Sequence, residues 1–200
     1  MTTTETVTPR VWIGCLASYN AGRLIGEWCD ATEGVEALRE CQAEVAQQAI
    51  AAAKEAGEWP VYFTEPEEFF LADNEGFGNL IGEYTPLWTV ADLAEQIELH
   101  GEAFIAYVEQ VVGTSYAEQV SWQEVAGDFE EAYVGTYESV EHYVEGYITE
   151  CGWEGLDGEQ VEQIVNYIDL DAVVRTMETG GEIVTYEKGY NEVLIFRGNV

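Results

Sequence analysis

The chain has 200 residues, of which 47% are hydrophobic and 12% aromatic, a composition that excludes wholesale disorder because it can build a core. Its 39 acidic and 7 basic residues give a formal net charge of −32, which opposes direct binding to nucleic acid or to an anionic membrane. No apolar run approaches the roughly 18 residues of a membrane-spanning helix, and no secretory signal is evident, so we expect a cytoplasmic protein.

The chain opens with a polar, threonine-rich stretch at 1–9 that predicts a disordered leader. Residues 10–84 are expected to form a first domain of α+β type. Branched and aromatic side chains at 10–16 predict its first strand, and a loop rich in Gly and Asn is expected to lead to a second short strand that ends at Trp28.

The first domain continues with one long helix. Apolar residues recur at three- and four-residue steps over 35–56, which is typical of an amphipathic helix, and Gly57 is placed to end it. Residues 61–63 predict a further strand. The acidic, glycine-containing segment after it is expected to be a loop.

Residues 85–127 are expected to form a small helical domain. Helices are predicted at 90–99 and 102–112, and two S-x-x-E capping boxes at Ser115 and Ser121 predict two shorter ones. Four short helices in so short a segment favour a small bundle.

Residues 128–200 are expected to form a third domain, again α+β. Helices are predicted at 140–150, 159–167 and 170–178, and a closing hairpin at 182–187 and 192–197. The expected fold class is therefore α+β, as an elongated chain of three small domains: an α+β domain with a short antiparallel sheet, a central helical bundle, and an α+β domain with a closing hairpin.

The four cysteines, Cys15, Cys29, Cys41 and Cys151, show no C-x-x-C spacing. In a reducing cytosol this pattern predicts free, buried thiols, with disulfides as the less favoured alternative.

Motifs for catalysis and for metal or cofactor binding are missing. The two histidines, His100 and His142, lack zinc-site spacing, and there is no G-x-S-x-G, no phosphate-binding glycine loop and no EF-hand pattern. Paired carboxylates are so abundant that no acid–base pair can be singled out. We therefore expect a protein that is not an enzyme, with no catalytic residue, no metal site and no cofactor.

The distribution of charge is the most informative feature. No basic residue lies between Lys54 and Arg175, although most of the 39 acidic residues do. The acids alternate with apolar and aromatic residues, which favours a folded surface over a solvated acidic tail. At the charge spacing of B-DNA, one per about 1.7 Å, a net charge of −32 matches about 54 Å of duplex, or about 16 base pairs.

This pattern supports the hypothesis that the surface imitates DNA, because each Lys or Arg would interrupt the imitation. One alternative is a highly acidic soluble protein of the kind found in halophiles, but such an adaptation would spread acids over the whole chain and use Asp as well as Glu. Another is an acidic chaperone for basic proteins, although no long acidic tail is present.

Four segments, taken in order, resemble the ArdA antirestriction family. They are RVWIGCLASYNAGRLIGEW at 10–28, DNEGFGNLIGEY at 73–84, DFEEAYVGTYESVEHYVEGYITECG at 128–152 and YIDLDAVVRTMETGGEIVTYEKG at 167–189. The similarity covers about residues 10–198.

The resemblance implies an elongated, bent homodimer of three-domain subunits whose carboxylates imitate bent B-form DNA. It implies that the partner is a type I restriction–modification enzyme, bound at the DNA groove of its modification and specificity subunits. Such proteins protect the incoming DNA of plasmids, transposons and phages in a bacterial host. Another DNA-binding defence complex, or a basic protein, remains as an alternative partner.

Two sets of residues follow from this hypothesis. The carboxylates expected on the DNA-mimic surface are Glu65, Glu67, Glu68, Asp92, Glu95, Glu98, Glu102, Glu109, Glu118, Glu124, Glu130, Glu131, Glu138 and Glu141. The resemblance also implies a dimer interface in the third domain, near Tyr133, Tyr137, Tyr143, Tyr147, Val193, Ile195 and Phe196. For the tyrosines, packing in the core of their own domain is the alternative.

Overall fold

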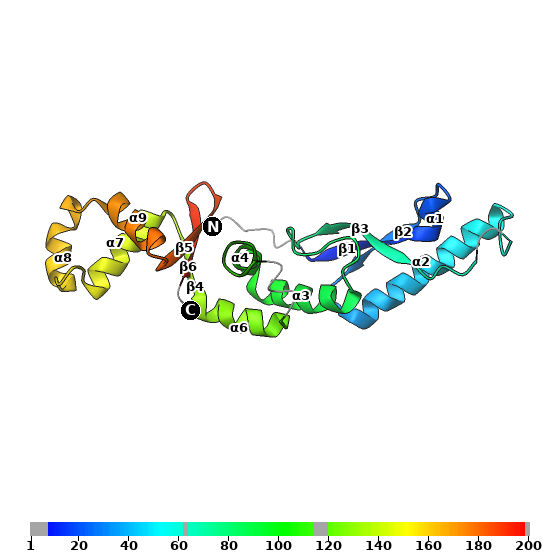
Figure 1. The fold of residues 1–200 in the computed structure, drawn as a ribbon, viewed down its shortest axis with the longest axis horizontal. Helices are drawn as coiled ribbons and strands as arrows, with labels where there is room; N and C mark the ends of the chain where they lie inside the picture. Colours follow the sequence, from blue (N-terminus) through cyan, green and yellow to red (C-terminus); the bar gives the residue numbers. More distant parts are fainter. Residues whose placement is uncertain (1–7, 62–63, 114–119, 199–200) are drawn as a thin grey trace. The chain divides into compact units, whose positions relative to one another are not determined.

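The computed structural model describes residues 8–61, 64–113 and 120–198 (Figure 1). Its helices and two three-stranded antiparallel sheets confirm the α+β class. Backbone contacts divide the chain into two compact units, Met1–Ile105 (unit 1) and Ala106–Val200 (unit 2). The three-domain organisation with boundaries at 84/85 and 127/128 stays a prediction.

Unit 1 contains a sheet with the strand order β2-β1-β3. The strands β1 (Arg10–Cys15) and β2 (Gly26–Asp30) form as expected. The prediction of a strand at 61–63 is not supported: Val61 lies in a turn, and 62–63 lie outside the described residues. The third strand is instead β3 (Phe69–Glu75), in the segment expected to be a loop, because its apolar start can pair with β1.

A short helix, α1 (Leu16–Asn20), replaces the start of the predicted loop after β1. The predicted long helix is confirmed as α2 (Val35–Glu55). It packs on the sheet through a cluster of buried residues, Cys15, Val45, Ala49 and Ala53. The small alanine side chains let the helix lie close to the strands.

The following helix, α3 (Leu87–His100), begins three residues earlier than predicted, because the Pro86 carbonyl oxygen already accepts from Val90 N. The helix predicted at 102–112 forms in two parts. It starts as α4 (Glu102–Tyr107) and ends as one π-helical turn, η1 (Val108–Val112), before Gly113 at φ 82°. The helix predicted from Ser115 falls outside the described residues.

Unit 2 continues with α6 (Trp122–Ala132), whose predicted cap is confirmed by the Ser121 side chain accepting from Glu124 N. The strand β4 (Tyr133–Tyr137), which the sequence did not predict, follows directly. Three more helices form where the sequence predicted them, and the predicted caps Ser139 and Asp169 are confirmed for the first and the last of them. Those helices are α7 (Val140–Cys151), α8 (Gly158–Ile164) with its 3-10 extension η2 (Val165–Tyr167), and α9 (Leu170–Thr179).

The predicted hairpin closes unit 2 as β5 (Ile183–Gly189) and β6 (Glu192–Arg197). The strand order β4-β6-β5 makes β6 central. Its inner residues are buried on both faces: Val193 and Ile195 join a cluster with α7 and α9, and Phe196 contacts Tyr107 and Phe129, with ring centroids 5.6 and 6.4 Å away.

The expectation of four free, buried thiols is wrong for three of the cysteines. Cys29 and Cys41 are joined by a disulfide, with Cα atoms 6.3 Å apart. Cys151 is free but exposed, and only Cys15 is both free and buried. Sequence spacing did not reveal the pair because β2 and α2 bring the two residues together only in the folded unit.

A close approach at Gly26 leads to a prediction for the stability of unit 1. A Cβ atom at Gly26 would overlap the ring of Trp12 and the carbonyl oxygen of Ile13. We expect Gly26→Ala to lower the free energy of unfolding by about 1–3 kcal/mol, the usual cost of overpacking. Urea unfolding measures the change.

The matched control for this substitution is Gly82→Ala, because a Cβ there would meet nothing within 4 Å. If both variants unfold at the same urea concentration, the close contact of Trp12 with Gly26 does not constrain the strand.

Candidate functional site: the carboxylate surface

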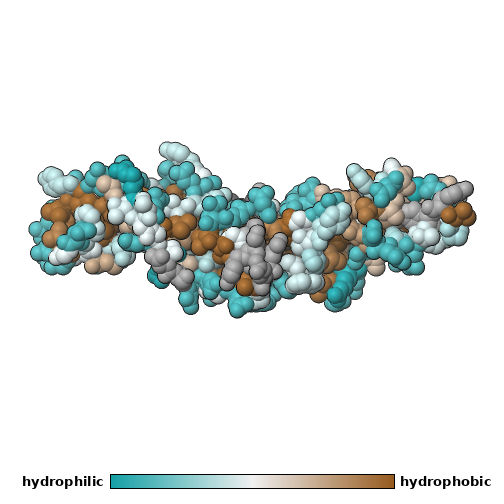
Figure 2. All heavy atoms as spheres, in the orientation of Figure 1, coloured by the Kyte–Doolittle hydropathy of each residue, from teal (hydrophilic) through white to brown (hydrophobic). Residues whose placement is uncertain are grey.

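The acidic side chains of the described residues all reach solvent. None of them is buried, whereas the buried polar side chains of this part of the chain are Ser18 and Gln96. An ionised carboxylate is costly to bury without a partner, so the acids gather on the outer side of each helix. Figure 2 shows hydrophilic residues over much of the visible face of each unit, with apolar patches between them.

On α3, acidic residues line the side that faces away from the core. Glu95 and Glu98 are exposed and Asp92 is half-buried, while Val90, Leu93 and Ile97 turn inward. Because the helix turns every 3.6 residues, steps of three place these carboxylates along one side. Glu102, at the start of α4, is exposed just beyond the end of this row.

On α6, a second acidic row runs along the solvent-facing side. Glu124, Asp128 and Glu131 are exposed at the positions i, i+4 and i+7, opposite the buried Trp122 and Phe129. Asp128 is absent from the residues that the sequence singled out. Its helical spacing from Glu124 was the signal that could have found it.

The remaining predicted carboxylates lie outside these two rows. Glu65, Glu67 and Glu68 are exposed in the segment before β3, Glu130 is exposed on α6, and Glu138 is exposed before α7. Glu109 on η1 and Glu141 on α7 are half-buried, and Glu118 lies outside the described residues. The structure therefore brings some of the predicted residues into local rows and leaves others apart.

Four basic residues outside the base-free segment form ion pairs with nearby carboxylates. Arg10 donates from Nε to Glu75 at 2.7 Å, and Arg23 donates to Glu58 at 2.8 Å. Two further ion pairs join Arg39 to Glu36 and Lys188 to Glu192. These four acids were not among those predicted for the DNA-mimic surface. Each of these four ion pairs neutralises a carboxylate outside the set that is expected to face a partner.

The first two ion pairs also shift the pKa values of their members. The hydrogen bond from Arg10 lowers the pKa of Glu75, and the one from Arg23 lowers the pKa of Glu58. A carboxyl group whose pKa is lower in the folded state stabilises the fold above its ordinary pKa. That contribution is lost as the pH falls through the lowered value.

The residues expected at a dimer interface differ in their surroundings. Val193, Ile195 and Phe196 are at most 7% exposed within one chain. Tyr133 stacks on Phe129 with centroids 5.1 Å apart. Tyr137 and Tyr143 are half-buried and pack against the helical cluster, while Tyr147 is 43% exposed. The interface itself stays a prediction.

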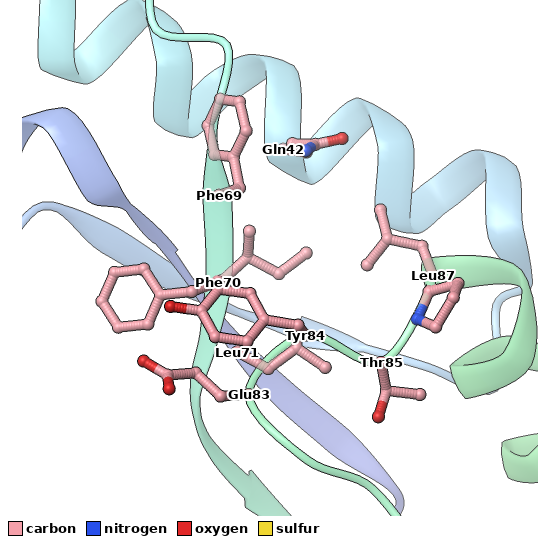
Figure 3. A pocket seen from close by; sticks show the side chains of 10 residues that line it. Gln42, Phe69, Phe70, Leu71, Glu83, Tyr84, Thr85 and Leu87 are labelled. Carbon is pink, nitrogen blue, oxygen red and sulfur yellow. The ribbon is translucent and has the colours of Figure 1, made fainter.

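A hollow of about 210 Å³ in unit 1 lies between α2, β3 and the segment before α3 (Figure 3). Neither histidine nor cysteine lines it, so it lacks the usual partners of a nucleophilic site. Its lining residues are Ile13, Gln42, Phe69, Phe70, Leu71, Glu83, Tyr84, Thr85, Pro86 and Leu87.

Neither a metal-binding cluster nor a membrane-spanning helix is present among the described residues. They hold no group of three or more His, Cys, Asp or Glu side chains placed to bind a metal ion. None of their helices has the length and apolar character needed to span a membrane.

Residues 11–192 match a family described as "Antirestriction protein (ArdA)". No curated protein matches the chain.

Proposed function

The chain belongs to the ArdA antirestriction family, and from this membership we propose that it inhibits a type I restriction–modification enzyme by imitating B-form DNA. Its carboxylates stand in for phosphates and occupy the groove that the modification and specificity subunits offer to DNA. Inhibition is competitive and stoichiometric and involves no catalysis. The result is protection of the incoming DNA of a mobile element.

The observation that carries this proposal is the placement of charge. A base-free segment contains most of the 39 acids, and no acidic side chain of the described residues is buried. Basic grooves that bind DNA derive much of their affinity from neutralising phosphates. A base-free segment that offers exposed carboxylates meets the same requirement.

The spacing of the helical rows sets a condition on the mimicry. Acids three or four residues apart on a helix advance by about 5 Å along its axis, whereas phosphates on one DNA strand advance by about 3.4 Å. One row, such as the acids of α6, is therefore sparser than a phosphate strand. A competent imitation needs several rows acting together, which a homodimer would double.

We further propose that the homodimer forms through unit 2. Tyr147 leaves 43% of its surface exposed beside Tyr143, and β4 is an edge strand with one open side. The mass measured by sedimentation equilibrium tests this step. A monomer at micromolar concentration would contradict it.

Competition with DNA is the direct test of the function. The protein is titrated into a type I methyltransferase bound to labelled target duplex, with an unrelated protein of equal charge as the control. We expect displacement at near-stoichiometric amounts of inhibitor, lost as salt rises, because screening weakens interactions between exposed charges. Displacement no better than that by the control protein would overturn the proposal.

A single charge reversal should have little effect on this competition. Glu98→Lys changes one exposed carboxylate on α3, and one exposed ion pair contributes only about 0.2–1 kcal/mol. We expect less than about a 5-fold rise in the concentration needed for half-displacement. Loss of inhibition by this one substitution would show that a few residues dominate binding, contrary to a distributed mimic.

A further inference from the structure

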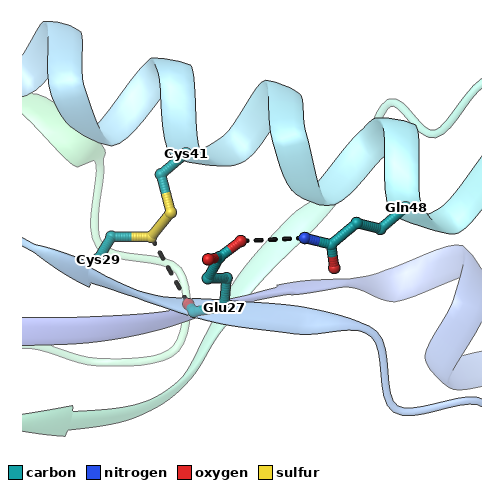
Figure 4. The surroundings of a disulfide bond; sticks show 4 residues. All are labelled: Glu27, Cys29, Cys41 and Gln48. Carbon is teal, nitrogen blue, oxygen red and sulfur yellow. Dashed lines mark hydrogen bonds between the residues drawn. A yellow bond between two sulfur atoms is a disulfide. The ribbon is translucent and has the colours of Figure 1, made fainter.

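The cysteine pair of unit 1 joins a sheet edge to the helix that covers it. Cys29 lies on β2 and is 5% exposed, and Cys41 lies on α2 and is half-buried. Their sulfur atoms are bonded across the space between strand and helix (Figure 4), and their Cα separation of 6.3 Å lies within the usual range for disulfides.

The position of β2 gives this bond a mechanical consequence. β2 is an edge strand, so its backbone pairs with β1 on one side only. Alternate residues of a strand face the same way, and both Glu27 and Cys29 are directed to α2. Glu27 accepts a hydrogen bond of 3.0 Å from the exposed Gln48 side chain, so the disulfide is the covalent member of two contacts that hold the edge strand to the helix.

Cys29 has a polar neighbour that suits the reduced state as well. Its Sγ atom lies 3.5 Å from the carbonyl oxygen of Glu27 (Figure 4). A thiol at this position can donate a weak hydrogen bond to that oxygen, whereas a disulfide sulfur carries no proton to donate. The buried site therefore accommodates the thiol without leaving it isolated.

We propose that Cys29 and Cys41 form a reversible disulfide that locks β2 onto α2 when the surrounding thiol pool is oxidised. Cys41 is the more accessible cysteine, so its thiolate attacks a small disulfide, such as glutathione disulfide, and releases one thiol. The Cys29 thiolate then displaces the second thiol from the mixed disulfide. Two cysteine thiols and one small disulfide become one protein disulfide and two small thiols. Two electrons and two protons pass from the cysteines to the small thiols.

The other two cysteines do not compete for this reaction within unit 1. Cys15 is fully buried among Val45, Ala49 and Ala53, out of reach of a small disulfide. Cys151 is exposed at the end of α7, in unit 2. Because an exposed thiol can link two chains, the test uses the full-length Cys151→Ser protein as its background.

The test follows thiol state and stability together. The protein is equilibrated in buffers of reduced and oxidised glutathione, alkylated, digested and weighed by mass spectrometry. In the oxidised buffer we expect Cys29 and Cys41 to escape alkylation. Their two peptides should then be recovered joined by the disulfide. We also expect slower hydrogen exchange in β2 and a melting transition higher by roughly 10 °C, since the bond closes a loop with a sequence separation of 12.

Two variants separate the disulfide from other effects of oxidation. Cys29→Ser/Cys41→Ser removes both thiols, and Cys41→Ser alone leaves the buried position of Cys29 intact. In each variant the difference between oxidised and reduced buffers should vanish. Full alkylation of both cysteines in excess glutathione disulfide, or a linked pair with unchanged exchange in β2, would overturn the proposal. No restriction enzyme enters the measurement, so its outcome is independent of the proposed function.

Discussion

Reversing the acidic row on α6 is expected to weaken competition with DNA by roughly 50-fold. The variant Glu124→Lys/Asp128→Lys/Glu131→Lys replaces three exposed carboxylates of one helix side by cations. Each reversal removes an attraction and adds a repulsion in a basic groove, at about 0.8 kcal/mol apiece, so three reversals at about 1.4 kcal/mol per factor of ten give roughly 50-fold. The titration against a methyltransferase–duplex complex measures the change.

The control for this variant changes the same total charge elsewhere. Glu33→Lys/Glu44→Lys/Glu182→Lys alters three exposed acids that lie outside the base-free segment. If net charge alone governed inhibition, both triple variants would lose affinity equally. A greater loss of affinity in the α6 variant, with circular dichroism unchanged, would assign the α6 row to the binding surface. Equal losses of affinity in the two variants would show that the row has no special part in binding.

Truncating Phe196 is expected to give the largest loss of stability in unit 2. The side chain is 0% exposed and contacts the rings of Tyr107, Phe129 and Tyr133, with centroids 5.6 to 6.4 Å away. Removing a buried phenyl ring forfeits its transfer free energy and leaves a cavity, which together cost about 3–5 kcal/mol. Urea unfolding of Phe196→Ala measures this loss.

The control is Tyr190→Ala in the turn of the same hairpin, where the side chain is 96% exposed and little change is expected. The dependence on protein concentration adds a second distinction. A residue of the core destabilises the unit equally at all concentrations, whereas a residue that acts only in a dimer interface loses its effect on dilution. Equal stability of the two variants would place Phe196 outside the core.

Family membership and the charge pattern were both accessible from the sequence. The four segments that resemble ArdA proteins agree with the family match over residues 11–192. The exposure of the acids also follows from composition, because a chain with 39 acids and 7 bases cannot pair most of its carboxylates in a core. To know which acids share one side of a helix, the register of each helix is needed. Asp128 on α6 was missed for that reason.

The sequence by itself determined the elements whose signals are local. The 3.6-residue pattern of α2, the caps at Ser139 and Asp169, and the β5–β6 hairpin are each specified within a few turns or one connection. Such signals depend on neighbours in the chain, so they can be read without knowing the fold.

Only the tertiary structure decided the features that depend on distant partners. β3 is a strand because it pairs with β1, and β4 is a strand because it pairs with β6. In each case the local strand signal was too weak to stand out from the acidic or glycine-containing residues around it. The Cys29–Cys41 bond likewise needed α2 to fold back over β2. Strand pairing and disulfide formation join residues that are separated by loops in the chain. Their free energy depends on how distant segments pack, which the local sequence does not encode.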